Sequence, residues 1–170
     1  QSTLENMGYF RAMVEGDTLL KNRKVSALYT VQTGNRYTIK DIIFDKDSSA
    51  LLKAINASSG KTLLKTGVYF DLETVKAERQ RIDTDLKEKG FYYFDPDYLI
   101  IQADSTTGNN TVDLQVKVKP GTPQRGRKVY TINDVYIFPG YRLSAQKADT
   151  LKSDAEYYKG YYVVDKRKTY

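Results

Sequence analysis

Hydrophobic and polar residues alternate in two stretches of the chain. Residues 25–31 read VSALYTV and residues 112–118 read VDLQVKV, with apolar side chains at every second position. A period of two places successive side chains on opposite faces of a strand, so each stretch predicts a strand with one buried face. Residues 98–103 (YLIIQA) predict a further strand, and the turn-forming residues 104–110 that follow predict a hairpin loop.

A helical pattern covers residues 72–89. Asp71 precedes it as a suitable N-cap, and Gly90 follows where a left-handed residue commonly ends a helix. A shorter helix is predicted to begin after Asp47 or Ser48, either of which can act as its N-cap. The apolar positions that lie along one face of the long helix are Leu72, Val75, Ile82 and Leu86.

Two short sequences occur twice. YTIKDIIF at residues 37–44 resembles YTINDVYIF at residues 130–138, and LENMGYF at residues 4–10 resembles LKEKGFYYF at residues 86–94. The repeat has a period of roughly 80–95 residues, which is typical of a chain built from similar structural units. The second copy has an insertion between the helix end and the Tyr-Thr-Ile strand.

The repeat divides the chain into units. Residues 37–121 hold all the elements, in the order strand, helix, helix, strand, strand, and form the complete unit. Residues 1–36 are predicted to be the C-terminal part of a preceding unit, and residues 129–170 the N-terminal part of a further unit with an insertion. Residues 122–128 (TPQRGRK) are predicted to be a linker. Because the sequence begins at Gln1, within a predicted helix, we expect it to be a piece of a longer protein.

The complete unit resembles a POTRA (polypeptide-transport-associated) domain. The resemblance covers residues 37–121 and, as fragments, both flanks, and it depends on the ordered set of segments rather than on one motif. The tail at residues 139–170 departs from a minimal POTRA domain and looks like an insertion in the BamA/TamA-type assembly factors of Bacteroidetes. The matching segments are Tyr37–Phe44, Gly67–Phe70, Ala77–Ile82, Leu86–Tyr92 and Val116–Gly121.

The resemblance implies an α+β fold of tandem POTRA units, each a three-stranded mixed sheet covered on one face by two helices. It implies a non-enzymatic scaffold at the periplasmic face of the outer membrane, in a protein of the surface-antigen type with its own C-terminal β-barrel. The implied partners are unfolded outer-membrane β-barrel proteins and accessory assembly proteins. Two roles stay open: a scaffold that binds clients by β-augmentation, and a docking module for one envelope partner, such as an assembly lipoprotein or an inner-membrane-anchored factor.

The resemblance also places the strand after the helices at a sheet edge, with the last strand in the middle. An edge strand has unpaired N–H and C=O groups to which another extended chain can be added. We therefore predict a client-binding edge at residues 97–103. The alternative is an edge blunted by its twist, by Pro96 and by the acidic residues Asp95, Asp97 and Asp104. Gly8, Gly67 and Gly90 are predicted to be structural positions. The predicted binding residues are Asp97, Tyr98, Leu99, Ile100, Ile101, Gln102 and Ala103.

The residue inventory argues against the usual catalytic sites. The chain has no histidine and no cysteine, which excludes thiolate zinc sites and catalysis by either residue. ASSGKT at residues 57–62 is not a phosphate-binding loop, because that motif requires glycine where Ile55 stands. Asp83, Asp85 and Glu88 lie on the predicted long helix and are expected to be solvated. We expect no cofactor, no metal and no enzymatic activity, while a site built from Ser, Lys or Asp alone stays open.

Charge and aromatic content add one candidate surface. The net charge is +6, but the basic residues are scattered rather than concentrated in a stripe, so we expect no nucleic-acid partner. YYKGYYVVDKRKTY at residues 157–170 is the best candidate for an exposed aromatic surface. The alternative is an ordinary strand pair that belongs to the further unit.

Overall fold

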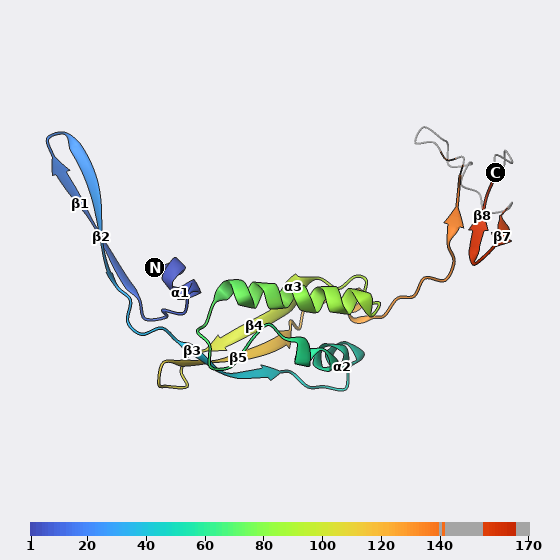
Figure 1. Cartoon of the computed structure of the whole chain (residues 1–170), viewed down its shortest axis with the longest axis horizontal. Coiled ribbons are helices and arrows are strands. Elements are labelled where there is room, and N and C mark those ends of the chain that lie inside the picture. Colours follow the sequence, from blue (N-terminus) through green and yellow to red (C-terminus); the bar gives the residue numbers. More distant parts are fainter. Residues whose placement is uncertain (140, 142–154, 166–170) are drawn as a thin grey trace. The chain divides into compact units, whose positions relative to one another are not determined.

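Figure 1 shows the computed structural model, which describes residues 1–139, 141 and 155–165. The chain divides into two units, Gln1–Val129 and Tyr130–Tyr170, and each is described by itself. Within these described residues, backbone pairing gives one sheet of two strands and two sheets of three strands. Within the described residues, no helix has the length and apolar character needed to cross a membrane.

The complete unit is built on a mixed sheet of β3 (Thr38–Phe44), β4 (Leu99–Asp104) and β5 (Thr111–Val118). β5 lies in the middle, parallel to β3 and antiparallel to β4. Helices α2 (Ala50–Ala57) and α3 (Leu72–Glu88) pack on this sheet through one shared core (Figure 1). This confirms the predicted α+β fold, in which two helices cover one face of a mixed sheet.

The alternation along β5 sorts its side chains between the two faces. Val112, Leu114 and Val116 are at most 2% exposed and pack toward the helices, while the residues between them lie on the open face. Ile82 and Leu86 of α3, both 0% exposed, belong to the same core. The strand and helix periods read from the sequence thus meet in one apolar layer.

Both helices begin at side-chain caps. Asp71 accepts a hydrogen bond of 3.0 Å from a backbone amide in the first turn of α3, as predicted. α2 is capped by Ser49 rather than by the predicted Asp47 or Ser48: the Ser49 hydroxyl accepts from the amide of Leu52 at 3.3 Å. Asp47 instead accepts from the amide of Ser49 at 2.6 Å, so it holds the cap in place from outside the helix.

The polar face of α3 is less exposed than its sequence indicates. Asp83 is only 2% exposed and pairs with Lys87 at 2.7 Å, so the prediction that it is solvated is wrong. The short 3₁₀ helix η2 (Pro96–Tyr98) packs on the side of α3 that carries Arg79, whose guanidinium donates to the carbonyl of Pro96 at 2.7 Å. Asp83 follows Arg79 by one turn, on this covered side.

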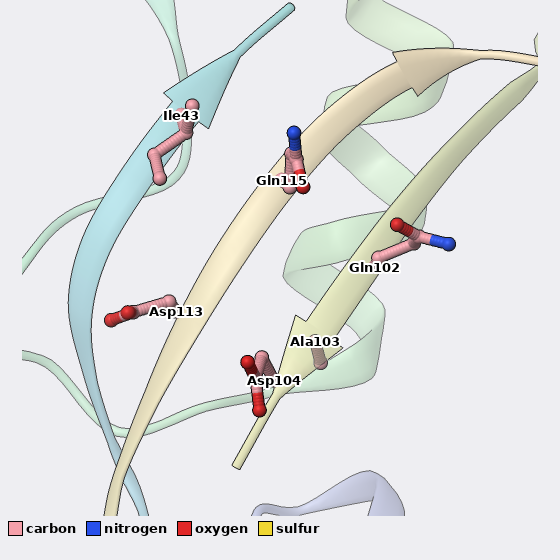
Figure 2. A pocket seen from close by; sticks show the side chains of 6 residues that line it. All are labelled: Ile43, Gln102, Ala103, Asp104, Asp113 and Gln115. Carbon is pink, nitrogen blue, oxygen red and sulfur yellow. The ribbon is translucent and has the colours of Figure 1, made fainter. Parts of the chain in front are cut away.

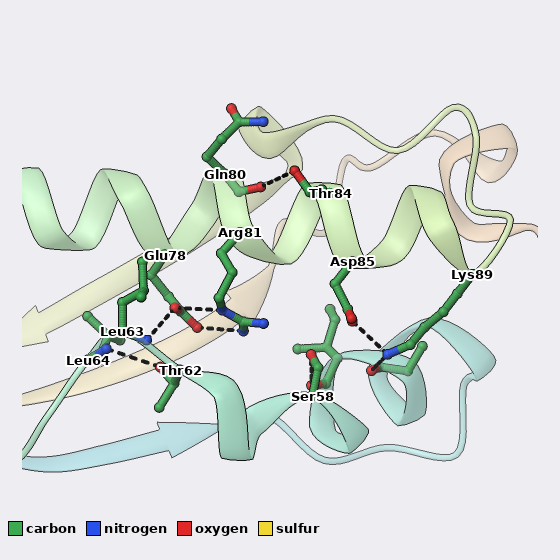
Figure 3. Close-up of polar contacts among 12 residues, drawn as sticks. Ser58, Thr62, Leu63, Leu64, Glu78, Gln80, Arg81, Thr84, Asp85 and Lys89 are labelled. Atoms are coloured by element: carbon green, nitrogen blue, oxygen red, sulfur yellow. Dashed lines mark hydrogen bonds and ion pairs between the residues drawn. The ribbon is translucent and has the colours of Figure 1, made fainter.

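Asp85 ties α3 to α2 (Figure 3). Its carboxylate pairs with Lys89 at 2.6 Å, and Lys89 also donates to the carbonyl of Ala54 in α2 at 3.1 Å. Burial acts to raise the pKa of Asp85, but hydrogen bonds from Lys89 and Ser58 outweigh it, so the pKa lies below its ordinary value.

This lowered pKa predicts a pH-dependent effect of the substitution Asp85→Asn. A carboxylate with a depressed pKa stabilises the fold above its unfolded pKa of about 3.9 and loses that contribution as the pH falls through the folded pKa. We expect the substitution to lower the melting temperature at neutral pH and to lower it less near pH ~2. Circular dichroism melts at both pH values measure this, and equal losses at the two would contradict it.

Residues 1–36 hold a short helix and a hairpin. The helix is α1 (Ser2–Asn6), and the hairpin joins β1 (Met13–Lys21) to β2 (Lys24–Gln32). Its turn residues, Asn22 and Arg23, have φ angles of 51° and 60°. Two left-handed residues are typical of the tight turn whose twist matches paired antiparallel strands.

The hairpin lacks the buried face predicted from its alternation. The strand predicted at residues 25–31 is present, but Val25, Tyr29 and Val31 are between 47% and 68% exposed. The prediction of burial is wrong here because β1 and β2 pair only with each other in the described residues, and no layer covers them.

Residues 122–128, predicted to be a linker, are folded. They contain a 3₁₀ turn, η3 (Gln124–Arg127), and Thr122 and Gly126 are buried. The guanidinium of Arg127 donates to the carbonyls of Thr122 and Lys119, each at 3.1 Å. This segment therefore packs back on the complete unit, while the unit boundaries stay a prediction.

The second unit contains a small sheet of β6 (Tyr136–Ile137), β7 (Glu156–Tyr158) and β8 (Tyr161–Val163). Its order is β6-β8-β7, with β6 parallel and β7 antiparallel to β8, which repeats the pattern of the complete unit. Residues 157–163 form a strand pair, as the alternative to an aromatic surface predicts, and the pair also leaves Tyr157 and Tyr158 68% and 60% exposed. Residues 166–170 and most of the predicted insertion lie outside the described residues.

Candidate functional site

The two edges of the β3-β5-β4 sheet use their backbone groups differently. The connector at residues 67–70 lies against β3: the amide of Gly67 donates to the carbonyl of Ile39, and the amide of Ile39 donates to the carbonyl of Val68, both at 2.8 Å. Gly67 has a φ of +80°, which glycine adopts readily and other residues do not. Part of the β3 edge is therefore occupied by the chain itself.

The register of β4 shows which of its backbone groups are used internally. Lys119 donates its amide to the carbonyl of Tyr98 at 2.8 Å, so Tyr98 is a hydrogen-bonded position of the antiparallel ladder with β5. Because such positions alternate, every second residue after Tyr98 also turns its N–H and C=O toward β5. These inward positions are Ile100, Gln102 and Asp104.

The remaining positions of β4 turn their backbone groups outward. These are Leu99, Ile101 and Ala103, and no hydrogen bond to their N–H or C=O groups is found across this edge in the described residues. Such a row of unpaired groups can accept one further strand. The sheet therefore has one partly covered edge and one open edge.

The open edge differs from the predicted one at both ends. Asp97 and Tyr98 lie in η2 and not in a strand, because Asp95 caps a 3₁₀ turn that starts at Pro96. At the other end the strand continues to Asp104, which the sequence had placed in the hairpin loop. The candidate edge is therefore Leu99–Asp104, and its role in binding stays a prediction.

Side chains along this edge alternate between the two faces of the sheet. Leu99 is 1% exposed and Ile101 is partly buried, both against the helix-covered core. On the open face, Gln102 lies opposite Gln115 and Asp104 lies opposite Asp113. Together with Ile43 and Ala103, these four side chains line a hollow of about 540 Å³. Figure 2 shows the six residues.

The acidic end of this hollow has an unusual hydrogen-bond pattern. Asp104 accepts from the amide and hydroxyl of Thr106 at 2.9 and 2.7 Å, and these bonds hold its pKa below the ordinary value. Oδ1 of Asp113 is buried without a hydrogen-bond partner in the described residues. The pairing of Asp104 with Asp113 was not predicted, because pairing across the strands follows from register, which alternation alone does not reveal.

Hydrogen bonds and a cation–π contact hold residues 1–36 against the complete unit. The carbonyl of Gly8, whose φ is +93°, accepts from the amide of Tyr37 at 2.9 Å. Arg36 donates to the carbonyl of Met7 at 2.7 Å, and its guanidinium lies 4.7 Å from the ring centre of Tyr69. Gly8 therefore lies at a packed junction, whereas Gly90, with a φ of 90°, ends α3.

The described residues offer no metal-binding cluster. No group of three or more Asp, Glu, His or Cys side chains among them could hold a metal ion. The paired carboxylates of Asp104 and Asp113 lie on an open sheet face, at the end of an edge strand. This geometry therefore places an open strand edge beside a polar hollow.

Comparison with solved structures identifies the fold. The chain superposes on the crystal structure of Haemophilus influenzae BamA POTRA3-5 with a TM-score of 0.52, at 18% sequence identity, over 94% of this chain and 59% of that chain. It is a POTRA fold. The chain thus spans about three-fifths of that structure, and at this identity the likeness concerns the fold alone.

Other comparisons add less. BamA from Haemophilus ducreyi lacking POTRA domains 1-3 matches 68% of this chain and 20% of its own length, with 18% identity and a TM-score of 0.45. No protein-family model and no curated protein matches the chain. The POTRA assignment therefore depends on the fold, and the role of the chain has to be argued from its open edge.

Proposed function

We propose that this chain is a non-enzymatic periplasmic scaffold that binds unfolded outer-membrane β-barrel proteins by β-augmentation and aids their assembly. The observation that carries the proposal is the open edge of β4, with outward backbone groups at Leu99, Ile101 and Ala103, beside a β3 edge that the chain partly covers itself. A client strand added there would extend the sheet to four strands with β4 no longer at its edge.

Backbone pairing suits a protein with many clients. Affinity in strand addition comes mainly from main-chain hydrogen bonds, which every sequence except proline can supply. Strands of outer-membrane barrels alternate apolar and polar residues. The helix-covered face of β4 is apolar, and its open face carries Ile100, Gln102 and Asp104. The POTRA fold shared with BamA supports a place next to an outer-membrane barrel, in a BamA/TamA-type protein that also binds accessory assembly proteins.

A docking role for one envelope partner is the second candidate. Exposed tyrosines favour it, because Tyr is enriched where proteins bind fixed partners. Tyr92 is 68% exposed, and the guanidinium of Arg125 lies 5.8 Å from the ring centre of its neighbour Tyr93. Such a site would respond to side-chain changes at these tyrosines, whereas strand addition would respond to blocked backbone groups at β4.

The substitution Ala103→Pro tests the scaffold proposal. Ala103 is exposed and its N–H points outward, so proline removes one edge donor and blocks the approach of a strand without breaking the ladder with β5. Ile100 is unsuitable, because its amide faces β5. We expect at least about a tenfold loss of affinity for extended peptides, measured by amide shifts on titration with an outer-membrane β-strand peptide.

The matched control is Ala103→Val, which keeps the N–H and favours a strand. Valine should bind the peptide nearly as the unaltered chain does. Unchanged binding by the proline variant, with its spectrum otherwise native, would overturn strand addition at β4 and turn attention to Tyr92 and Tyr93.

A further inference from the structure

The register of β4 determines where the side chains of an added strand would lie. In an antiparallel client strand, the residues opposite Leu99, Ile101 and Ala103 would exchange backbone hydrogen bonds with them. The side chains of these client residues would lie over the helix-covered face. Client residues opposite Gln102 and Asp104 would occupy non-hydrogen-bonded pairs, in which side chains lie closer together, on the open face. The two sets of client side chains therefore meet different surroundings.

The helix-covered side of the edge is apolar. Leu99 is buried, and Ile101 packs against the core. Apolar client side chains would extend that layer. A charged client side chain on this side would lose hydration without gaining a partner.

The open side of the edge is acidic at one end. Asp104 and Asp113 lie directly opposite each other on adjacent strands, an arrangement of like charges that costs stability. The hollow shown in Figure 2 is lined by both of them and by Gln102 and Ala103 of the edge strand.

We propose that the β4 edge selects an extended peptide that carries a lysine or arginine opposite Asp104, with its cation in the hollow beside Asp104 and Asp113. This rests on the proposed function, because it requires a strand at β4. The cation pairs with Asp104, the residue directly opposite it, and reduces the repulsion between the two carboxylates. The selected client has alternating residues, apolar toward the helices and polar toward the open face, with a basic residue at one polar position.

Capped nine-residue peptides that alternate threonine and valine test this selection on the whole chain. One central threonine is replaced by lysine, glutamine or glutamate, and a fourth peptide carries the lysine at a valine position. The shifted lysine lies on the helix-covered side when the valines keep their place, because one step along a strand changes the face. Amide shifts of Leu99, Ile101 and Ala103 on titration give each dissociation constant.

We expect the lysine peptide to bind about fivefold more tightly than the glutamine peptide, and the glutamate and shifted-lysine peptides to bind more weakly still. Asp113→Asn and Asp104→Asn, made separately, should each reduce the difference between lysine and glutamine, as should added salt. Equal binding of the lysine, glutamine and glutamate peptides at β4 would overturn the selection and leave the scaffold proposal standing. Failure of all four to shift β4 would overturn the scaffold proposal itself.

Discussion

Replacing Glu78 by alanine is expected to lower the free energy of unfolding by about 3–5 kcal/mol. Glu78 lies on α3 and is 0% exposed. Its carboxylate accepts two bonds from the guanidinium of Arg81, at 2.8 and 2.9 Å, and one from the amide of Leu63 at 2.8 Å (Figure 3). Alanine leaves the Arg81 cation, which is only 17% exposed, and the backbone amide of Leu63 without their acceptor.

The matched control lies on the same helix. Glu73 pairs with Lys76 at 2.7 Å with the same i,i+3 spacing, but its side chain is 74% exposed. Glu73→Ala should cost less than about 1 kcal/mol, because water solvates both partners of an exposed pair. Urea unfolding followed by circular dichroism at neutral pH measures both variants.

Comparing the two variants shows whether the loss of unfolding free energy comes from the burial of Glu78 or from ion pairing alone. Equal and small losses of unfolding free energy for Glu78→Ala and Glu73→Ala would show that the buried pair is not what attaches the segment at Leu63 to α3. Glu78→Gln should fall between the two, since its amide oxygen can still accept a bond from Leu63 but no longer pairs as an anion.

The parts of the fold that sequence predicts well are those with a strong period. β5 and α3 match the predicted strand and helix to within one or two residues, because alternation and a helical stripe each specify a buried face. Buried charges such as Glu78 and Asp83 were not predicted, since a charged residue reads as solvated unless its partner is known. Their burial depends on which segments of the chain pack on α3, and no local sequence pattern encodes that packing.

In the candidate site, too, the strand was predicted from the sequence but its tertiary contacts were not. Alternation and the POTRA resemblance locate a strand near residues 98–103, but its register with β5 decides that Ala103 has a free amide and Ile100 does not. Register depends on partners that are distant in sequence, as does the pairing of Asp104 with Asp113. β2 shows the reverse case: its pattern predicts a buried face, but the layer that would bury it is absent from the described residues.

Replacing Gly8 by alanine is expected to cost about 2–4 kcal/mol and to loosen residues 1–12 from the complete unit. The φ of +93° is strained for any residue with a Cβ. A Cβ at this position would also lie 2.9 Å from the backbone oxygen of Phe70 and 3.3 Å from its Cβ. Because backbone cannot rotate away as a side-chain end can, the junction itself has to shift.

Gly67→Ala is the matched control, because Gly67 shares the positive φ, +80°, but a Cβ there meets nothing within 4 Å. It should cost only the conformational part, about 1–2 kcal/mol. Hydrogen exchange distinguishes the two: the amide of Tyr37, which donates to the carbonyl of Gly8, should lose protection in Gly8→Ala and keep most of it in Gly67→Ala. The ring centre of Phe10 lies 5.0 Å from that of Phe70 and 5.1 Å from that of Tyr37. If residues 1–12 detach from the complete unit, the Phe10 ring therefore also becomes exposed. Equal protection of Tyr37 in both variants would mean that backbone conformation alone, and not the close approach to Phe70, requires glycine at residue 8.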